Sequence, residues 1–310
     1  MTHKVLSFDL GGTKLAAGVV NRQGRILESV EVPALMEQGK EVVIDQLVSL
    51  GREFMAKHPE IKRIGMASAG PLDPLKGILL DPTNYAGPKG TWGKVPITKI
   101  LQKRLKVPVL LENDAAAAAL AEHWIGSAKK ADNAVILTLG TGLGTGVICN
   151  GALVRAGKNR HTEAGHIIIH ANDKSAPCGC GNLGCAEAYL SGRSFGRRAQ
   201  QRFGRSDLTA RDIANLAKHH DPRAIAAFEE YSEIMAIALY SYTKLYCPDI
   251  FIFSGSFSKA APLFLPHTER HLERLLEREL KTERQPKLEI SCLQNQAGLI
   301  GGAYIAFNRK

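Results

Sequence analysis

Apolar runs separated by glycine-containing turns open the chain. Val5–Leu10, Leu15–Val20 and Ile26–Val32 are three such runs, and their spacing predicts an antiparallel meander of three strands. Lys40–Lys57 then repeats apolar residues at the spacing of one helix face. The beginning of the chain therefore predicts a small sheet that is followed by a helix.

The same order of elements recurs in the second half of the chain. A second meander is predicted over Asn133–Leu139, Gly146–Asn150 and Ala152–Arg155. Two such openings, each followed by helices and further strands, indicate a duplicated α/β unit. The other predicted elements are strands at Ile61–Ala69, Val107–Leu111 and Ile250–Phe253, and helices at Ile97–Leu105, Asp114–Trp124, Pro222–Tyr246, Thr268–Arg284 and Gln296–Phe307.

The length of 310 residues allows two domains of ordinary size. We expect residues 1–120 and 296–310 to form a smaller N-terminal α/β domain. Residues 121–295 would then form a larger C-terminal α/β domain that carries a cysteine cluster. The hydrophobic content of 45% and charged content of 23% are typical of a soluble globular protein.

Several features predict a cytoplasmic protein that does not enter a membrane. The N-terminus reaches Asp9 before a long apolar run can form, so no signal peptide is visible. The longest apolar stretch, Ala115–Ala121, is too short to cross a bilayer. The six cysteines are not spaced as the disulfide framework of a secreted protein.

The net charge of +10 is compatible with two kinds of partner. One is nucleic acid, and the other is a small anion such as a nucleotide or polyphosphate. The densest arginine segment, residues 193–205, has no interleaved aromatic platform beyond Phe195 and Phe203. Because no zinc-finger or RNA-binding spacing is present either, we expect no nucleic-acid partner.

Three cysteines, Cys178, Cys180 and Cys185, lie within eight positions and are interleaved with glycines. Thiolates packed so closely repel one another unless a metal neutralises them or a disulfide removes them. A C-x-C pair cannot close a relaxed disulfide, and three sulfurs with one imidazole form the usual closed shell of structural zinc. The fourth ligand is predicted to be His166, with His161 and His170 as alternatives.

Two glycine-rich turns carry candidate phosphate ligands. In the first, Gly11 and Gly12 allow close backbone approach, Thr13 and Lys14 offer a hydroxyl and a cation, and Asp9 can hold a hydrated Mg²⁺. An ordinary hairpin turn is the alternative reading.

The second turn spans 140–146 and contains Gly140, Thr141, Gly142 and Gly144. It lacks the Lys-Ser/Thr ending of a P-loop and is followed by a strand, so it is no Walker or dinucleotide motif. Its glycines and threonines still make a nest for phosphate. Two such turns in related halves predict that a nucleotide's phosphates are clamped between the domains.

The segment Glu112-Asn113-Asp114 ends a buried strand and begins a helix. Asp114 can be a helix N-cap. A carboxylate at the end of a strand beside a cleft is also where a general base for a substrate hydroxyl belongs. The segment alone leaves both readings open.

Five motifs in this order resemble the ROK family of sugar kinases, the group of bacterial glucokinases, N-acetylmannosamine kinases and fructokinases. The resemblance covers essentially the whole chain. The motifs are the Asp9 turn, Glu112-Asn113-Asp114, the 140–146 turn, Glu163-Ala164-Gly165-His166, and the cysteine segment that ends at Glu187.

The resemblance implies a duplicated actin-like, ribonuclease-H-like ATPase fold with two domains that close over ATP-Mg²⁺ and a hexose, most simply glucose. It implies that Asp114 takes the proton from the attacking hydroxyl and that Gly255 lies on the adenosine side. The sugar would be bound by Gly70, Asn84, Asn113, Glu163, His166 and Glu187. Zinc would organise this pocket through His166, and we expect a homodimer. Phosphoryl transfer needs mainly positioning and charge neutralisation.

Some residues depart from the family pattern. The segment 84–92 is longer than usual, which affects sugar choice, and Thr162 and Ser254 replace glycines. The alternative sugars are N-acetylmannosamine, N-acetylglucosamine and fructose, and polyphosphate is a second candidate donor. A sugar-sensing repressor of the same family would carry an N-terminal helix-turn-helix, whereas this sequence begins at the first strand. A silent sugar-binding protein would not need Asp114 and both glycine turns.

Overall fold

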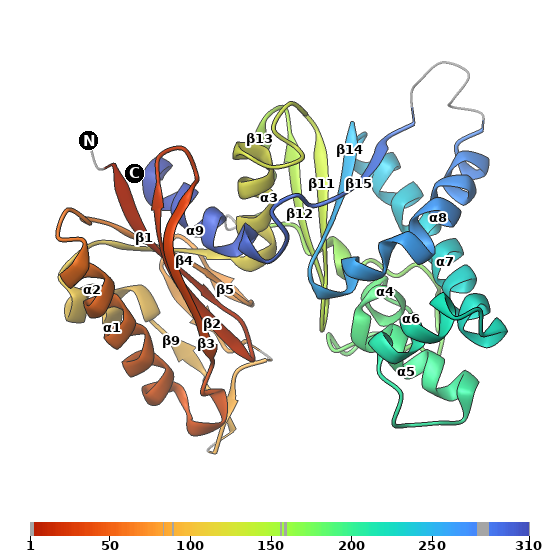
Figure 1. Cartoon of the computed structure of the whole chain (residues 1–310), viewed down its shortest axis with the longest axis horizontal. Coiled ribbons are helices and arrows are strands. Elements are labelled where there is room, and N and C mark those ends of the chain that lie inside the picture. The colour runs from red at the N-terminus through yellow and green to blue at the C-terminus, as the bar shows by residue number, and fades with distance from the viewer. Residues whose placement is uncertain are drawn as a thin grey trace. The chain divides into compact units, whose positions relative to one another are not determined.

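The computed structural model describes residues 3–82, 84–88, 90–155, 157, 160–277 and 285–309 (Figure 1). The chain forms two compact units. Unit 1 comprises Met1–Lys129, Leu153–Thr162 and Gln296–Lys310, and unit 2 comprises Lys130–Ala152 and Glu163–Asn295. The domain ranges expected from the sequence differ from these units in two segments, because 121–129 and 153–162 belong to unit 1.

In the described part of unit 1, the main sheet has the strand order β10-β4-β1-β2-β3. β1 pairs antiparallel with β2, and β2 pairs antiparallel with β3, as the first meander predicts. β4 and β10 extend the sheet in parallel. The strands are β1 (Lys4–Leu10), β2 (Lys14–Asn21), β3 (Ile26–Pro33), β4 (Ile64–Ser68) and β10 (Val109–Asn113), with the short strands β5 (Leu72–Asp73), β6 (Ile78–Leu80), β7 (Ala86–Gly87), β8 (Gly90–Thr91) and β9 (Lys94–Val95).

Helices cover both faces of this sheet. α1 and α2 bury Val43, Leu47 and Leu101 in the core that contains Leu6 and Phe8 of β1. The neighbouring residue of β1, Val5, points to the other face, as strand alternation requires, and packs with Ala303 and Ala306 of α9. The helices are η1 (Met36–Gln38), α1 (Lys40–Lys57), α2 (Ile97–Leu105), α3 (Asp114–Trp124) and α9 (Ala297–Asn308).

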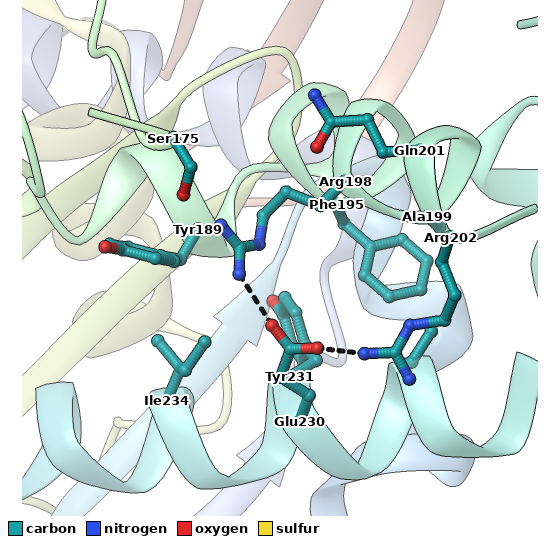
Figure 2. Close-up of a pocket in the computed structure, with 11 residues that line it drawn as sticks. Ser175, Tyr189, Phe195, Arg198, Ala199, Gln201, Arg202, Glu230, Tyr231 and Ile234 are labelled. Carbon is teal, nitrogen blue, oxygen red and sulfur yellow. Dashed lines mark hydrogen bonds and ion pairs between the residues drawn. The ribbon is translucent and has the colours of Figure 1, made fainter. Parts of the chain in front are cut away.

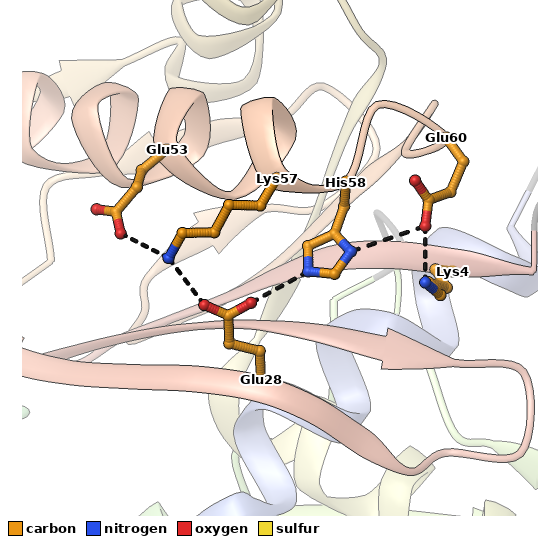
Figure 3. A network of polar contacts seen from close by, with 6 residues as sticks. All are labelled: Lys4, Glu28, Glu53, Lys57, His58 and Glu60. Atoms are coloured by element: carbon orange, nitrogen blue, oxygen red, sulfur yellow. Dashed lines mark hydrogen bonds and ion pairs between the residues drawn. The ribbon is translucent and has the colours of Figure 1, made fainter.

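A surface network of charged side chains ties the end of α1 to the sheet. Glu28 of β3 accepts hydrogen bonds from Lys57 Nζ at 2.9 Å and pairs with His58 Nε2 at 3.1 Å (Figure 3). Glu60 continues the network to Lys4 of β1, whose Nζ lies 2.7 Å from the Glu60 carboxylate. Such exposed pairs contribute little free energy individually, so the apolar core carries most of the packing.

Unit 2 repeats the sheet of unit 1. Its order is β13-β12-β11-β14-β15, and the antiparallel pair β11 and β12 again lies beside two parallel strands. This repetition confirms the duplicated α/β fold. The described elements are β11 (Ala134–Leu139), β12 (Leu143–Cys149), β13 (Ala152–Leu153), η3 (Ala164–His166), α4 (Glu187–Leu190), α5 (Gly192–Phe203), α6 (Ala210–Lys218), α7 (Pro222–Tyr246), β14 (Ile250–Ser254), η4 (Ser256–Ala260), α8 (Ala261–Leu275), β15 (Lys287–Ile290) and η6 (Gln294–Gln296).

One helix differs from its prediction. α8 begins at Ala261, before the expected Thr268, and runs through Pro266. The start of α8 fits Pro262, because proline is favoured in the first turn of a helix. Helix interiors disfavour proline, but α8 buries Phe264 and Leu272 and packs against α7, so tertiary packing outweighs the cost of Pro266. The last part of the expected helix, 278–284, lies outside the described residues. No described helix has the length and apolar character needed to cross a membrane.

Candidate active site

The predicted residues of unit 1 gather at one edge of its sheet. β1, β4 and β10 run parallel, and their register places Leu10 and Asn113 on either side of Ser68. The residues that follow these strand ends are the turn after Leu10, Gly70, and Asn113-Asp114. The carboxyl ends of adjacent parallel strands are a common location for ligand sites.

Asp9, the last residue but one of β1, is one of the acidic residues at this edge. Loss of hydration, followed by the nearby charges of Asp114 and Glu31, raises the pKa of Asp9 to about 7. α9 approaches Asp9 at Gly298, where an added Cβ would lie 2.0 Å from Asp9 Oδ2. Only glycine therefore fits there without moving the carboxylate. Gly298 was missed by sequence reasoning, because the glycines of the last helix indicate only close packing.

The first glycine turn is a tight hairpin. Gly11 N–H donates to the Lys14 carbonyl at 2.9 Å, and an added Cβ on Gly12 would lie 3.2 Å from the carbonyl oxygen of Asn84. Asn84, expected to bind sugar, is therefore next to this turn, and its side chain is exposed. Lys14 forms an exposed ion pair with Glu31, so a phosphate group would have to compete with that carboxylate.

The start of α3 separates the roles of Asn113 and Asp114. Asn113 is the N-cap, and its Oδ1 accepts hydrogen bonds from the N–H groups of Ala115 and Ala116 at 2.8 and 3.1 Å. Asp114 is the first residue of the helix, and its Oδ1 accepts from Ala115 N–H at 2.8 Å. The capping role that the sequence allowed for Asp114 therefore belongs to Asn113. Gly70 leaves room for the Asn113 amide, whose Nδ2 would lie 3.3 Å from an added Cβ.

The second glycine turn is shorter than the segment 140–146 expected from the sequence. β12 begins at Leu143, so Gly144 is paired with Thr138 inside the sheet and only 140–142 form the turn. The Thr145 hydroxyl is buried and accepts a hydrogen bond from Ala164 N–H at 3.0 Å. It is therefore not part of a phosphate nest, whereas Thr141 is exposed in the turn.

Gly255 lies beside this turn. It follows β14, the parallel neighbour of β11, with a φ of 84°, and an added Cβ would lie 2.5 Å from the Leu139 carbonyl oxygen. Gly192, at the start of α5, donates its N–H to the Gly140 carbonyl at 2.8 Å. Gly192 was not identified from the sequence. The local signal that could have identified it is its position directly after Ser191, the N-cap of α5.

The segment Glu163–His166 forms a short 3-10 turn, η3. Tyr242 of α7 donates its hydroxyl hydrogen to the Ala164 carbonyl at 2.8 Å. An added Cβ on Gly165 would lie 2.1 Å from the Leu143 carbonyl oxygen, which fixes the turn against the start of β12. Glu163 is exposed, and His166 is half-buried.

His166 and the three cysteines form one cluster. Their donor atoms all lie within 4.8 Å of one another; Cys178 Sγ is 3.4 Å from His166 Nδ1, and Cys180 Sγ is 3.6 Å from Cys185 Sγ. Among the described residues, neither alternative histidine joins this group. The exposed His170 lies 3.5 Å from Asp173 Oδ2 instead, and His161 belongs to unit 1.

Glu187 connects the cluster to the second glycine turn. Its Oε2 accepts a hydrogen bond from Leu143 N–H at 2.9 Å, and Cys178 Sγ lies 3.4 Å from its Oε1. An added Cβ on Gly142 would lie 2.6 Å from Oε2. A phosphate-turn candidate, a sugar-ligand candidate and the cysteine cluster are thus in direct contact within unit 2.

A separate pocket of about 260 Å³ lies beside α5 and α7. Glu230 of α7 accepts hydrogen bonds from Arg198, at 2.6 Å, and from Arg202 (Figure 2). The Arg198 guanidinium also lies 4.8 Å from the centre of the Tyr189 ring. These two arginines of the dense basic segment are therefore engaged within unit 2, and none of the predicted site residues lines the pocket.

Comparison with known proteins agrees with the motifs. The model of the ROK family matches residues 5–309. A glucokinase of Thermotoga maritima is 32% identical, over 99% of this chain and 98% of that protein, and an N-acetyl-D-glucosamine kinase of Citrobacter koseri is 29% identical over 96% and 97%. A ROK family glucokinase of Streptomyces griseus, solved in complex with glucose and AMPPNP, is 29% identical, with a TM-score of 0.83 over 98% of this chain and 99% of that one.

Proposed function

The chain belongs to the ROK family and is an ATP-dependent sugar kinase, and we propose that its preferred acceptor is glucose, phosphorylated on the 6-hydroxyl. The similarity to two bacterial glucokinases over nearly their whole length supports this choice. The observation that most supports this function is that Asn113, and not Asp114, is the N-cap of α3. This supports a different role for the Asp114 carboxylate beside Asn113, that of the general base.

The proposed roles follow the two sheets. In unit 1, Asp114 takes the proton of the sugar hydroxyl, Asp9 holds Mg²⁺, and the turn at Gly11-Gly12 binds phosphate. In unit 2, the turn at 140–142 and Gly255 bind the nucleotide. The sugar is bound by residues of both units, namely Gly70, Asn84, Asn113, Glu163, His166 and Glu187. Burial raises the pKa of Asp9, and a bound Mg²⁺ would offset this shift because a divalent cation favours the ionised carboxylate.

We also propose that the cluster of Cys178, Cys180, Cys185 and His166 holds a zinc ion. The four donor atoms fit, because tetrahedral zinc needs four sulfur or nitrogen donors and these lie within 4.8 Å of one another. Zinc would neutralise the thiolates and fix His166, whose Nδ1 faces Cys178. It would also hold the segment that precedes Glu187, so its role is to shape the sugar site rather than to react.

One structural observation favours an N-acetylated hexosamine as the alternative acceptor. The longer segment 84–92 would crowd the sugar site if its large side chains faced that site. Its two large residues, Tyr85 and Trp92, are instead buried and in contact, with ring centres 4.9 Å apart, and Tyr85 donates its hydroxyl hydrogen to the Leu10 carbonyl at 2.5 Å. Their bulk therefore belongs to the core of unit 1 and is not available to exclude an acetyl group.

A coupled assay that measures ADP release tests the proposal. The sugars are glucose, mannose, fructose, N-acetylglucosamine and N-acetylmannosamine, with ATP or polyphosphate as donor. We expect the highest kcat/KM for glucose with ATP. A tenfold higher kcat/KM for an acetylated hexosamine would keep the sugar-kinase activity and overturn glucose as the substrate.

A further inference from the structure

Glu112 is a fully buried carboxylate immediately before the two residues at the start of α3. Its side chain is 0% exposed. Oε1 accepts a hydrogen bond from Asn113 N–H at 3.0 Å, and Oε2 accepts from Arg155 Nη2 at 2.6 Å and also from Arg309. Two cations from distant parts of the sequence therefore meet on one carboxylate at the end of β10.

This arrangement keeps Glu112 ionised. Burial alone would raise the pKa of Glu112, but the Arg155 hydrogen bond and the charges of both arginines outweigh it and hold the pKa below its usual value. Buried ion pairs are costly to desolvate and are often matched in stability by apolar residues. Stability alone is therefore a weak reason for this group, so its effect on the local geometry has to be considered.

The network joins the segments that carry the site in unit 1. Glu112 binds the backbone of Asn113, whose side chain caps α3 and so places Asp114. Arg309, just after α9, also donates to the Leu111 carbonyl at 2.8 Å and accepts from Arg63 through its own carbonyl at 2.5 Å. Arg309 thus contacts the end of β10 at the Glu112 side chain and at the backbone carbonyl of Leu111.

Arg155 brings a third segment to the same point. It forms an antiparallel bridge with His161, so the segment 155–161 begins and ends at this bridge. The chain continues from His161 through Thr162 directly into Glu163, a proposed sugar ligand. The contact with Glu112 therefore ties the bridge between Arg155 and His161 to the end of β10.

We propose that Glu112, Arg155 and Arg309 are positioning residues for phosphoryl transfer, which fix the end of β10 so that Asp114 meets the sugar hydroxyl. This rests on the proposed role of Asp114 as the base. Misplacement of a reacting group by about 1 Å costs on the order of 100-fold in rate, so loosening this network should lower kcat more than it changes ATP binding.

The test compares Arg155→Lys, Arg155→Gln and Arg155→Met in the full chain, with ATP and the best sugar of the acceptor screen. Arg309 still pairs with Glu112 in these variants, so we expect them to fold. We expect kcat to be highest for Arg155→Lys, lower for Arg155→Gln and lowest for Arg155→Met, with about a 10- to 100-fold loss for Arg155→Met. The KM for ATP should stay within threefold of wild type in all three variants. Hydrogen exchange of the Ala115 and Ala116 amides should accelerate.

Arg104→Met is the matched control, because Arg104 pairs with Asp45 at a similar distance, 2.5 Å, but on the surface of unit 1. It should keep wild-type kcat and exchange. A kcat within twofold of wild type for Arg155→Met overturns the proposal, and if that variant is insoluble the same limit applies to Arg155→Gln. Asp114→Asn, measured alongside, separates the two proposals. If Asp114→Asn is active, Asp114 is not the general base. If Asp114→Asn is inactive but the Arg155 variants are fully active, only the proposed positioning role of the network is refuted.

Discussion

Glu187 accepts a hydrogen bond from the backbone N–H of Leu143 at 2.9 Å. Leu143 is the first residue after the second glycine turn, and Glu187 lies two residues after Cys185. One carboxylate therefore links the turn proposed to bind ATP to the cluster proposed to bind zinc. A substitution at Glu187 can disturb sugar binding and the glycine turn separately, depending on which hydrogen bonds the new side chain keeps.

Glutamine and alanine at position 187 should separate these two functions. The carbonyl oxygen of Glu187→Gln can still accept from Leu143 N–H, but the charge that strengthens bonds to sugar hydroxyls is lost. We expect about a tenfold higher KM for the sugar and a KM for ATP within threefold. Glu187→Ala should raise both KM values. Equal KM values for ATP in the two variants would contradict the link to the turn.

Asp114→Asn should lower kcat by about two to four orders of magnitude and leave sugar affinity nearly intact, because the amide cannot accept the proton. Steady-state kinetics and sugar titration measure the two effects. Asp221→Asn is the control, since Asp221 caps α7 through two backbone N–H groups and asparagine caps equally well. If Asp114→Asn keeps more than a tenth of the wild-type kcat, Asp114 is not the base.

Purified protein should contain about one zinc ion per chain. Cys180→Ser should lose the metal and the kinase activity, because the cluster holds His166 and the segment before Glu187. Cys247→Ser is the control: Cys247 is exposed at the end of α7 and should keep both. Metal analysis by mass spectrometry decides the matter, and full activity of a zinc-free protein would refute the structural role.

Local signals explain why much of the fold follows from the sequence. α1, α2 and α3 have the predicted bounds, because apolar periodicity and helix ends are determined by nearby residues. The cysteine cluster is equally local. The cap of α3 required geometry, since Asn113 and Asp114 are both good N-caps and only the backbone shows that Asn113 occupies the position.

The missed residues depend on contacts between distant segments. Gly298 matters because α9 passes Asp9, and Arg155 and Arg309 matter because both reach Glu112. Their surroundings in the sequence contain no motif that indicates these partners. The length of the second glycine turn was also overestimated, because glycines at 144 and 146 are compatible with a strand whose partner, β11, is fixed by the sheet.

Gly298→Ala should lower kcat/KM for MgATP by about 100-fold without unfolding the protein, because its Cβ would displace the Asp9 carboxylate. Gly196→Ala is the matched control. Gly196 also lies in a helix, but an added Cβ would meet its nearest neighbour, the Ala210 amide nitrogen, at 3.5 Å, an ordinary contact. Alanine is the better helix former at both positions, so a similar loss in both variants would contradict the specific effect on Asp9.

Asp9→Asn should inactivate the kinase and stabilise the fold above neutral pH. The pKa of Asp9 is about 7 in the folded protein, against an ordinary value of 3.8, so the folded state holds the proton more tightly than the unfolded state. Stability is therefore lost as pH rises from about 4 to about 7, by roughly 2 to 4 kcal/mol. Asparagine carries no such charge, so its advantage over wild type should be larger at pH 8 than at pH 5.5.

Urea unfolding of both proteins at these two pH values, without Mg²⁺ or nucleotide, measures this difference. Added Mg²⁺ should then raise the unfolding midpoint of wild type at pH 8 and leave that of Asp9→Asn unchanged, because the cation neutralises a carboxylate that only wild type has. An equal difference in the free energy of unfolding between the two proteins at both pH values would show that the pKa of Asp9 is not raised in the folded protein. An equal response to Mg²⁺ would show that the cation binds elsewhere.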